Sequence, residues 1–412
     1  MITGSQAIRA LQADGPPIVI LAAIPAGEAV LHACAEYGIP VRCFCDSKPE
    51  KAAHGYCGLE VVHTPQLGRA FPEARIIIAA PGIEAAVAQL ARLGYGEKDM
   101  FPAASILRDF RIGGQQFTVA PEYIEYSVAA CIANHESFLR PEMTVIRSVD
   151  VVVTERCSLK CRDCSNLMQY YANPVDGDAG EILASVDALC GAVDAVHEFR
   201  VIGGEPFMRR DWPEIVEALL ERQPDRYVAV YTNGTIAPDV QTLSRFSGKR
   251  VVFYITDYGP LSRGLNVLVT RLSGLGLAWN RVVMDGWTDC ARIEPHNRDQ
   301  NGQQKVFDDC CAKKLHTLLG GRLYHCPFAA NAVNLGAIPD DPGNRLSLLE
   351  TDGGAPLRRR TAEFLANAAP IPACRFCCGR DYYAPADFPP AIQTSAPLAY
   401  TRYGGDTTKE NR

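Results

Sequence analysis

The sequence predicts an α/β protein built from two successive series of strand–helix units, followed by a small cysteine-rich domain. In both series, short runs rich in β-branched residues alternate with helical patterns, which is typical of parallel sheets with crossover helices. Three closely spaced cysteines follow the first strand of the second series, and another cysteine group lies nearer the C-terminus. The chain has 412 residues, more than one hydrophobic core usually serves, so we expect several domains.

The first series predicts a small parallel α/β domain over residues 1–112. Its expected strands and helices are, in order, Ile18–Ala22, Glu28–Tyr37 (helix), Val41–Cys45, Glu60–His63, Arg75–Ala80 and Ile83–Leu93 (helix). The phrase FCDSKP at residues 44–49 resembles the end of the second strand in small Rossmann-like domains fused to sugar-modifying enzymes and transferases. This resemblance implies a Rossmann-like fold.

A nucleotide site in this domain is open to two interpretations. A dinucleotide loop needs Gly-x-Gly-x-x-Gly so that the backbone can approach a pyrophosphate, whereas Ala22–Gly27 offers one glycine. Asp46 stands where an acidic residue would hold a ribose hydroxyl, or it caps a turn. We expect no nicotinamide binding, while docking or nucleotide-sugar recognition stays open.

The second series occupies residues 146–300, after a connector at residues 113–145. Its expected strands are Ser148–Thr154, Phe199–Ile202, Tyr227–Tyr231, Val251–Thr256 and a last one near Leu277–Met284, with helices at Glu181–Val193 and Trp212–Arg222. Repeated βα units with their chemistry at the C-terminal ends of the strands predict a barrel or partial barrel.

Cys157, Cys161 and Cys164 stand directly after the run Val151–Thr154. Three residues and then two separate the thiols, which is neither a zinc-knuckle pair nor a ferredoxin run. Three thiolates on one loop can bind three irons of a four-iron cluster and leave the fourth without a protein ligand. Because an open iron can bind a small molecule and pass it an electron, the motif predicts an enzyme.

This triplet, with Gly203-Gly204-Glu205-Pro206 after the next strand, resembles the radical S-adenosylmethionine (radical SAM) superfamily. The resemblance implies a partial (β/α)6 barrel, a four-iron four-sulfur cluster at the triplet, and S-adenosylmethionine chelated to the open iron. It also implies that the carbonyls of Gly203 and Gly204 hold the ligand's ammonium. The other residues that it assigns to this pocket are Glu205, Thr232, Asn233 and, near the ribose, Asp257.

One position departs from the family pattern. Family members usually carry an aromatic residue just before the third cysteine, where it packs on the adenine side, and here that residue is Asp163. The cluster ligands are unaffected by this change. We therefore expect the adenine contacts to come from elsewhere in the chain.

The second cysteine group is similar to the hairpin that opens the auxiliary-cluster extension of sugar-modifying and peptide-maturing radical SAM enzymes. The resemblance implies a second four-iron cluster, with a zinc ion as the alternative. Its four expected ligands are Cys311, Cys326, Cys374 and Cys377. No cysteine follows Cys378, so the shorter twitch form of this SPASM-like extension fits best over residues 301–380, with a tail at 381–412.

Two neighbouring cysteines leave this assignment open. Cys310 could replace Cys311, and Cys378 could replace Cys377. Whichever thiol is free is either a hydrogen-atom donor to a substrate radical or a spare buried residue. In the tail we expect the aromatic residues Tyr382, Tyr383 and Phe388 to cover the mouth of the barrel.

The function that the resemblance implies is reductive cleavage of S-adenosylmethionine to a 5′-deoxyadenosyl radical, which abstracts hydrogen from a substrate. The N-terminal domain favours a small molecule (a sugar, nucleotide sugar or amino-acid derivative) that is oxidised, epimerised or joined. Maturation of a ribosomally made peptide is the second hypothesis, and a non-catalytic iron–sulfur electron carrier or sensor is the third. An external donor such as flavodoxin or ferredoxin is the expected electron source.

Composition excludes other partners. The net charge is −6, and we find no dense lysine or arginine block and no apolar run long enough for a membrane span. We therefore expect neither a nucleic-acid nor a membrane partner. Sixteen cysteines without a secretory signal predict a reducing, cytoplasmic compartment in which thiols serve metals or catalysis.

Overall fold

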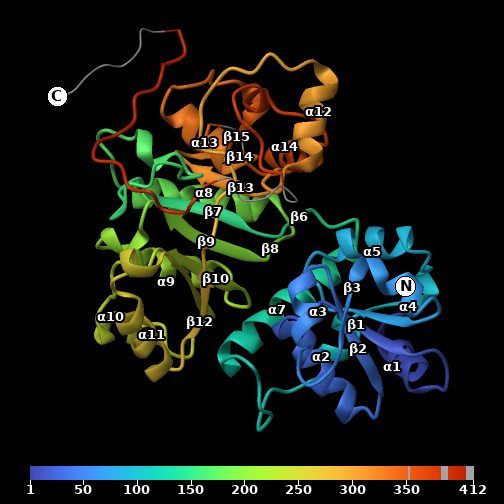
Figure 1. The fold of residues 1–412 in the computed structure, drawn as a ribbon. Helices are drawn as coiled ribbons and strands as arrows, with labels where there is room; N and C mark the ends of the chain where they lie inside the picture. Colours follow the sequence, from blue (N-terminus) through green and yellow to red (C-terminus); the bar gives the residue numbers. More distant parts are fainter. Residues whose placement is uncertain (351–352, 382–387, 405–412) are drawn as a thin grey trace. The chain divides into compact units, whose positions relative to one another are not determined.

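The computed structural model describes residues 1–350, 353–381 and 388–404. It divides into two compact units, Met1–Met143 and Thr144–Arg412, each built on a sheet that is wholly or mainly parallel, with flanking helices (Figure 1). The mixed α/β class expected from the sequence is confirmed. None of the helices in the described ranges is both long enough and apolar enough to cross a membrane.

The first unit has a five-stranded, all-parallel sheet in the order β3-β2-β1-β4-β5. The strands are β1 (Ile18–Leu21), β2 (Val41–Asp46), β3 (Val61–His63), β4 (Arg75–Ile78) and β5 (Met100–Pro102). This order, in which the chain starts at the centre and winds to both edges, is that of doubly wound α/β folds. The Rossmann-like assignment itself stays a prediction.

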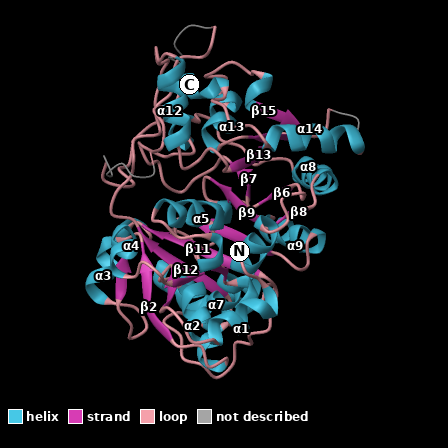
Figure 2. Ribbon diagram, turned by 90° about the vertical axis from the view of Figure 1, so that its right-hand side faces the viewer, coloured by secondary structure: helices cyan, strands magenta, loops and turns pink. Residues whose placement is uncertain are grey.

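Helices cover both faces of this sheet, as Figure 2 shows. Along β1, Ile18 and Ile20 face one apolar cluster, while Val19 and Leu21 face the other, because successive strand residues point to opposite faces. The first cluster involves α1 (Gly4–Gln12), α2 (Pro25–Glu36), α6 (Ala104–Leu107) and α7 (Pro121–Phe138); the second involves α4 (Leu67–Ala70) and α5 (Ile83–Arg92), and α3 (Pro49–His54) packs near β3. Since α7 packs on α2 and α6, most of the expected connector belongs to this unit.

Asp46 has internal partners in this unit. Its carboxylate accepts hydrogen bonds from the backbone N–H of Ala23 at 2.9 Å and of Lys48 at 3.0 Å, and it pairs with the Lys51 ammonium at 2.8 Å. It is also buried. Of the two interpretations, these contacts match the cap of a turn.

The second unit is built on an eight-stranded sheet in the order β12-β11-β10-β9-β7-β13-β14-β15. Its strands are β7 (Val149–Thr154), β9 (Glu198–Gly203), β10 (Tyr227–Thr232), β11 (Val251–Asp257), β12 (Ala278–Val283), β13 (His316–Leu319), β14 (Arg322–Tyr324) and β15 (Arg345–Ser347). The six from β12 to β13 in sheet order are parallel, and the last two are antiparallel. A separate pair joins β6 (Val145–Ile146) to β8 (Ala195–Val196).

The sixth parallel strand comes from the cysteine-rich region. We expected a barrel confined to residues 146–300, yet β13 pairs with β7 through Val149, Asp150 and Val151. The hairpin of β13 and β14 forms as expected, with Gly320 and Gly321 at φ values of +56° and +72° in its turn. The cysteine-rich region therefore continues the same sheet instead of forming a separate layer.

Helices α8 (Ala179–Ala192), α9 (Trp212–Arg222), α10 (Val240–Ser244) and α11 (Leu265–Gly274) follow the first strands in turn. They bury one face of the sheet in an apolar core that includes Phe199, Val201 and Phe253. Asp178 caps α8 by accepting a hydrogen bond from the Glu181 N–H at 2.7 Å. Farther along lie α12 (Gln300–Asp309), α13 (Pro327–Asn334) and α14 (Ala355–Leu365).

A buried histidine next to β8 makes this unit acid-sensitive. Burial, together with the nearby charges of Arg226 and Arg147, lowers the pKa of His197 from 6.5 to about 4. The unfolded chain therefore takes up a proton below pH 6.5 that the folded chain refuses, and stability is lost as the pH falls from 6.5 to about 4. The loss amounts to about 3 kcal/mol at 1.36 kcal/mol per pKa unit.

We expect His197→Gln to flatten this acid dependence. The measurement is the free energy of unfolding in urea at neutral and at acidic pH, followed by fluorescence. His54→Gln, at an exposed position, is the control and should keep the wild-type slope. An unchanged slope for His197→Gln would show that other groups cause the acid sensitivity.

Candidate functional site

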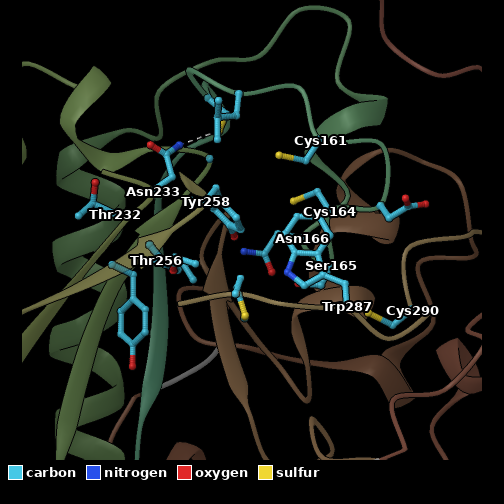
Figure 3. Close-up of a pocket in the computed structure, with 18 of the residues that line it drawn as sticks. Cys161, Cys164, Ser165, Asn166, Thr232, Asn233, Thr256, Tyr258, Trp287 and Cys290 are labelled. Carbon is cyan, nitrogen blue, oxygen red and sulfur yellow. Dashed lines mark hydrogen bonds between the residues drawn. The ribbon is translucent and has the colours of Figure 1, made fainter. Parts of the chain in front are cut away.

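A cavity of about 350 Å³ lies at the C-terminal ends of the strands of the second unit. The loop after β7 and the ends of β9, β10 and β11 provide one part of its wall, and residues 284–290 and Arg380 provide another. Figure 3 shows Cys161 and Cys164 on one loop, with Asn233 and Tyr258 across the cavity. The predicted residues that line it are Cys157, Cys161, Cys164, Gly203, Gly204, Thr232 and Asn233.

The three loop thiols lie close enough to influence one another. Burial raises the pKa of Cys157, and the thiols of Cys164 and Cys161 raise it further. Burial also raises the pKa of Cys164, and that of Cys161 to about 11. Among the described residues no three His, Cys, Asp or Glu side chains could together hold a single metal ion. The ligands of a four-iron cluster each bind a different iron, so what these thiols share is the cavity.

The two glycines at the end of β9 permit a close approach of two backbones. A Cβ on Gly203 would stand 2.1 Å from the Thr154 carbonyl oxygen, and a Cβ on Gly204 would stand 2.3 Å from that of Arg156. The Gly204 position would also meet the Cβ of Cys157 at 2.8 Å. Glycine at these positions thus lets β9 press against the first residues of the cysteine loop.

Asn233 connects the end of β10 to this loop. Its side-chain oxygen accepts a hydrogen bond from the Thr235 N–H at 3.0 Å, which fixes the orientation of the amide. The NH₂ group then donates to the Ser158 hydroxyl at 3.1 Å and lies 3.7 Å from the Cys157 sulfur. Asn233 therefore both lines the cavity and contacts a predicted cluster ligand.

Glu205 is fully buried and does not line the cavity. Its carboxylate accepts hydrogen bonds from the Thr232 hydroxyl at 2.9 Å and from the backbone N–H of Asn233 at 2.8 Å and of Phe207 at 3.2 Å. Burial raises its pKa to about 7, and these three donors act in the opposite direction. Its place in the structure is that of a support that holds the Thr232–Asn233 turn.

Asp257 also lies outside the lining of the cavity. One of its oxygens accepts a hydrogen bond from the Gly259 N–H at 2.8 Å, and the other pairs with Arg281. Its neighbours Thr256 and Tyr258 line the cavity instead. The residues of this segment that line the cavity are thus the two neighbours of Asp257 in the sequence, and not Asp257 itself.

Three aromatic residues, Tyr231, Tyr258 and Trp287, are among those that line the cavity, as is Asp163. Tyr258 and Trp287 meet edge to face, with ring centroids 5.6 Å apart. Asp163 is itself buried and bonds to the Arg162 guanidinium at 2.9 Å. Sequence reasoning missed both members of this edge-to-face pair, and Trp287 carried no motif that could have marked it.

The second cysteine group gathers around Cys377. Burial raises the pKa of Cys377 well above its usual value, and the thiols of Cys326, Cys310 and Cys374 raise it further. Burial likewise raises the pKa of Cys326 to about 12, with Cys374 and Cys310 adding to the shift. Cys311 is exposed. The structure thus brings Cys310, and not its neighbour Cys311, to the other three thiols.

Hydrogen bonds hold this group in place. The Arg298 guanidinium donates to the backbone carbonyls of Cys374 at 3.1 Å, Cys377 at 2.8 Å and Cys378 at 3.4 Å. The Cys311 N–H donates to the Arg380 carbonyl at 2.9 Å. Arg298 is therefore a structural support of the second cysteine group.

Three further residues, Cys378, Cys290 and Arg380, differ in whether they line the cavity. Cys378 lies near charged side chains, among them Asp289, Glu294 and Arg292, and does not line the cavity. Cys290 is buried and does line it, and so does Arg380. The Arg380 guanidinium influences thiols of both groups, including Cys164 and Cys377. It makes no hydrogen bond or ion pair with another described side chain.

Residues 151–260 match the family model of the radical SAM superfamily. This segment is a radical SAM domain. The match begins in β7 and includes the cysteine loop, the Gly203–Gly204 turn and Asn233. Members of this superfamily are enzymes that bind a four-iron four-sulfur cluster and S-adenosylmethionine. The residues of the radical SAM domain fit the cluster and S-adenosylmethionine, since three thiols and a glycine turn line one cavity.

Curated relatives match only a part of this chain. A probable GTP 3′,8-cyclase of Methanocella arvoryzae is 36% identical over 96 residues, which are 22% of this chain and 28% of the relative. A GTP 3′,8-cyclase of Mycobacterium tuberculosis is 32% identical over 115 residues, 26% of this chain and 32% of the relative. The chain therefore spans about a third or less of the length of these two relatives.

Solved structures give more distant likenesses. anSMEcpe with bound AdoMet matches with a TM-score of 0.35 and 13% identity, over 54% of this chain and 84% of that chain. BtrN in complex with AdoMet and 2-DOIA matches with a TM-score of 0.33 and 15% identity, over 44% and 73% of the two chains.

Proposed function

We propose that the chain cleaves S-adenosylmethionine reductively and abstracts hydrogen from a small molecule bound in the cavity. The observation that carries this proposal is that the three loop thiols, the glycine turn and Asn233 line one cavity. Bound together, a four-iron cluster and S-adenosylmethionine supply one-electron chemistry that can break an unactivated C–H bond. The residues of the chain hold and orient these groups and exclude water from them.

Each part of the cavity wall has a proposed task. Cys157, Cys161 and Cys164 bind three irons as thiolates, and the backbone of Gly203 and Gly204 accepts the ammonium of S-adenosylmethionine. Tyr258 and Trp287 line the cavity, and we assign them the adenine contacts that Asp163 cannot make. Glu205 acts through Thr232 and Asn233, whose positions it fixes.

The substrate end of the cavity is proposed to lie near Arg380, Thr288 and Cys290. Of the described residues that line the cavity, Arg380 is the one cation, which favours an anionic substrate such as a nucleotide sugar or an amino-acid derivative. The GTP 3′,8-cyclase relatives carry the name of a nucleotide, which agrees with a phosphorylated substrate. Cys290 lines the cavity, whereas Cys310 and Cys378 do not, and this supports Cys290 as the thiol closest to such a substrate.

The test of this function is anaerobic incubation of the reconstituted protein with reductant, S-adenosylmethionine and deuterated candidates. Anionic sugars, nucleotide sugars and amino-acid derivatives form one set, and short peptides form the other. Deuterium in the released 5′-deoxyadenosine identifies the substrate and the position from which hydrogen is taken. No cleavage of S-adenosylmethionine, with iron measured at the loop cysteines, would overturn the proposal.

We also propose that the second cysteine group binds a second four-iron cluster, with zinc as the alternative. Its ligands would be Cys310, Cys326, Cys374 and Cys377, because these thiols influence one another. A cluster there could accept an electron from the substrate radical, which is thereby oxidised, and a flavodoxin or ferredoxin would supply the electron that reduces the first cluster.

A pair of adjacent variants tests the ligand set. Cys310→Ala is expected to remove the iron of the second site, while Cys311→Ala keeps it, because only the Cys310 thiol lies with the other three. The measurement is iron, sulfide and zinc content per chain after reconstitution. The reverse pattern would make Cys311 the ligand, and zinc in place of iron in the wild type would exclude the second cluster.

A further inference from the structure

The described residues 388–404 of the tail lie along the cysteine loop, and we call them the C-terminal strap. Three backbone hydrogen bonds join the strap to the segment from Lys160 to Gln169. The Arg162 N–H donates to the Ile392 carbonyl at 2.7 Å, the Thr394 N–H to that of Lys160 at 2.7 Å, and the Leu398 N–H to that of Gln169 at 2.8 Å. Figure 1 shows this red segment beside the green loop.

Gln393 sits at the centre of these contacts, opposite Cys161 in an antiparallel bridge. Its side-chain oxygen accepts a hydrogen bond from the Lys160 N–H at 2.7 Å. Its NH₂ group donates to the Ala391 carbonyl at 2.8 Å and to the Cys161 sulfur at 3.3 Å. Because the Lys160 N–H can only donate and the Ala391 carbonyl can only accept, the amide cannot be flipped. An N–H group must therefore face the sulfur.

The strap also keeps water away from this sulfur. Ala391 is 3% exposed and packs with Leu159 and Cys161 in a small apolar cluster that Tyr258 and Trp287 adjoin. The backbones of Phe388 and Trp287 exchange two hydrogen bonds, at 2.9 and 3.0 Å. Of the aromatic residues expected to cover the barrel, Tyr382 and Tyr383 lie outside the described residues. Phe388 is thus one fixed end of the strap.

We propose that Gln393 is a positioning residue of the cluster site, which raises the reduction potential of the cluster and slows its loss through the N–H···S hydrogen bond to Cys161. The inference rests on the proposed cluster at Cys157, Cys161 and Cys164. Hydrogen bonds to cluster sulfurs and exclusion of solvent are among the factors that set the potentials of iron–sulfur centres. A donor stabilises the reduced state, because that state carries more negative charge on sulfur. The strap would make the C-terminal segment part of the redox site.

Two variants test this role on the full chain. Gln393→Glu keeps the shape of the side chain and replaces the donor by a carboxylate, and Gln393→Met removes the donor without adding charge. Thr394→Val is the matched control, because Thr394 meets Lys160 mainly through its backbone N–H. The readouts are the potential of the first cluster, from a titration followed by electron paramagnetic resonance, and the rate of iron loss to a chelator.

Both Gln393 variants should lower the potential, the glutamate variant more. At a fixed poise we expect the ratio of reduced to oxidised cluster to fall about tenfold, which corresponds to about 59 mV for one electron. Iron loss should be about 10- to 100-fold faster, as is typical when a partner of a metal ligand is removed. A wild-type potential in both variants would overturn the inference. Absence of iron from the loop cysteines of the wild type would instead overturn the proposed function.

Discussion

Replacing Cys157 by alanine is expected to abolish cleavage of S-adenosylmethionine and to remove the iron of the first site while the second site keeps its own. Cys157 lines the cavity, lies next to the Gly203–Gly204 turn and receives the Asn233 amide at 3.7 Å. The cluster would then keep only two of its three thiolate ligands. Apart from the three loop cysteines, Cys290 is the one described cysteine that lines the cavity, and it lies in the segment 284–290 and not on the cysteine loop. The measurements are iron and sulfide content and release of 5′-deoxyadenosine.

Cys190→Ala provides the matched control for this loss. Cys190 is a partly buried thiol on α8 that accepts a hydrogen bond from Gln223 at 3.4 Å, and it does not line the cavity. The control should keep both iron and cleavage. If Cys157→Ala still releases 5′-deoxyadenosine, the cluster that cleaves S-adenosylmethionine does not depend on the three loop cysteines and must be sought at another site.

Gly204→Ala is expected to have the second large effect, because the fold has no room for the added methyl group. The new Cβ would stand 2.3 Å from the Arg156 oxygen and 2.8 Å from the Cβ of Cys157, so the cysteine loop must move. Overpacking of this kind costs about 1–3 kcal/mol. Because the displaced atoms include a predicted cluster ligand, we expect a loss of bound iron and of S-adenosylmethionine cleavage in addition to the loss of stability.

Gly191→Ala is the control for a glycine-to-alanine change in the same unit. Gly191 lies in α8, and a Cβ added to it would have no neighbouring atom within 4 Å, so alanine fits there. We expect the control to keep its iron and to gain about 0.4–1 kcal/mol of stability, because alanine restricts the unfolded chain. Iron content and the free energy of unfolding are measured for both variants. Full iron content in Gly204→Ala would mean that the loop can shift without harm.

The strands were predictable because buried parallel strands appear in the sequence as continuous β-branched runs. The predicted Ser148–Thr154 is β7 (Val149–Thr154), with all six residues buried, and the predicted Val251–Thr256 is β11 (Val251–Asp257). Cys157 and Gly203 could be placed near each other because each lies at or shortly after the C-terminal end of one of two neighbouring strands. Local pattern and parallel pairing together determine this part of the site.

Contacts between distant segments were not predictable. Gln393 and Cys161 are 232 residues apart, and no periodicity connects them. The choice between Cys310 and Cys311 depends on the pairing of this segment with residues 380 and 381, since adjacent residues point in different directions. We also expected the barrel to end before residue 300, whereas its sixth parallel strand is β13. The local pattern of a strand does not show which strand of the sheet it pairs with, so the pairing of β13 with β7 could not be predicted.

The pairing of β13 with β7 has a consequence for any shortened form of this protein. A chain cut before His316 would leave β7, with its run of valines, as an edge strand whose N–H and C=O groups lack partners along Val149, Asp150 and Val151. Bare apolar edges of this kind recruit strands from other molecules. We therefore expect the segment matched by the family model to aggregate when it is expressed alone, because the strand that covers this edge comes from the cysteine-rich region.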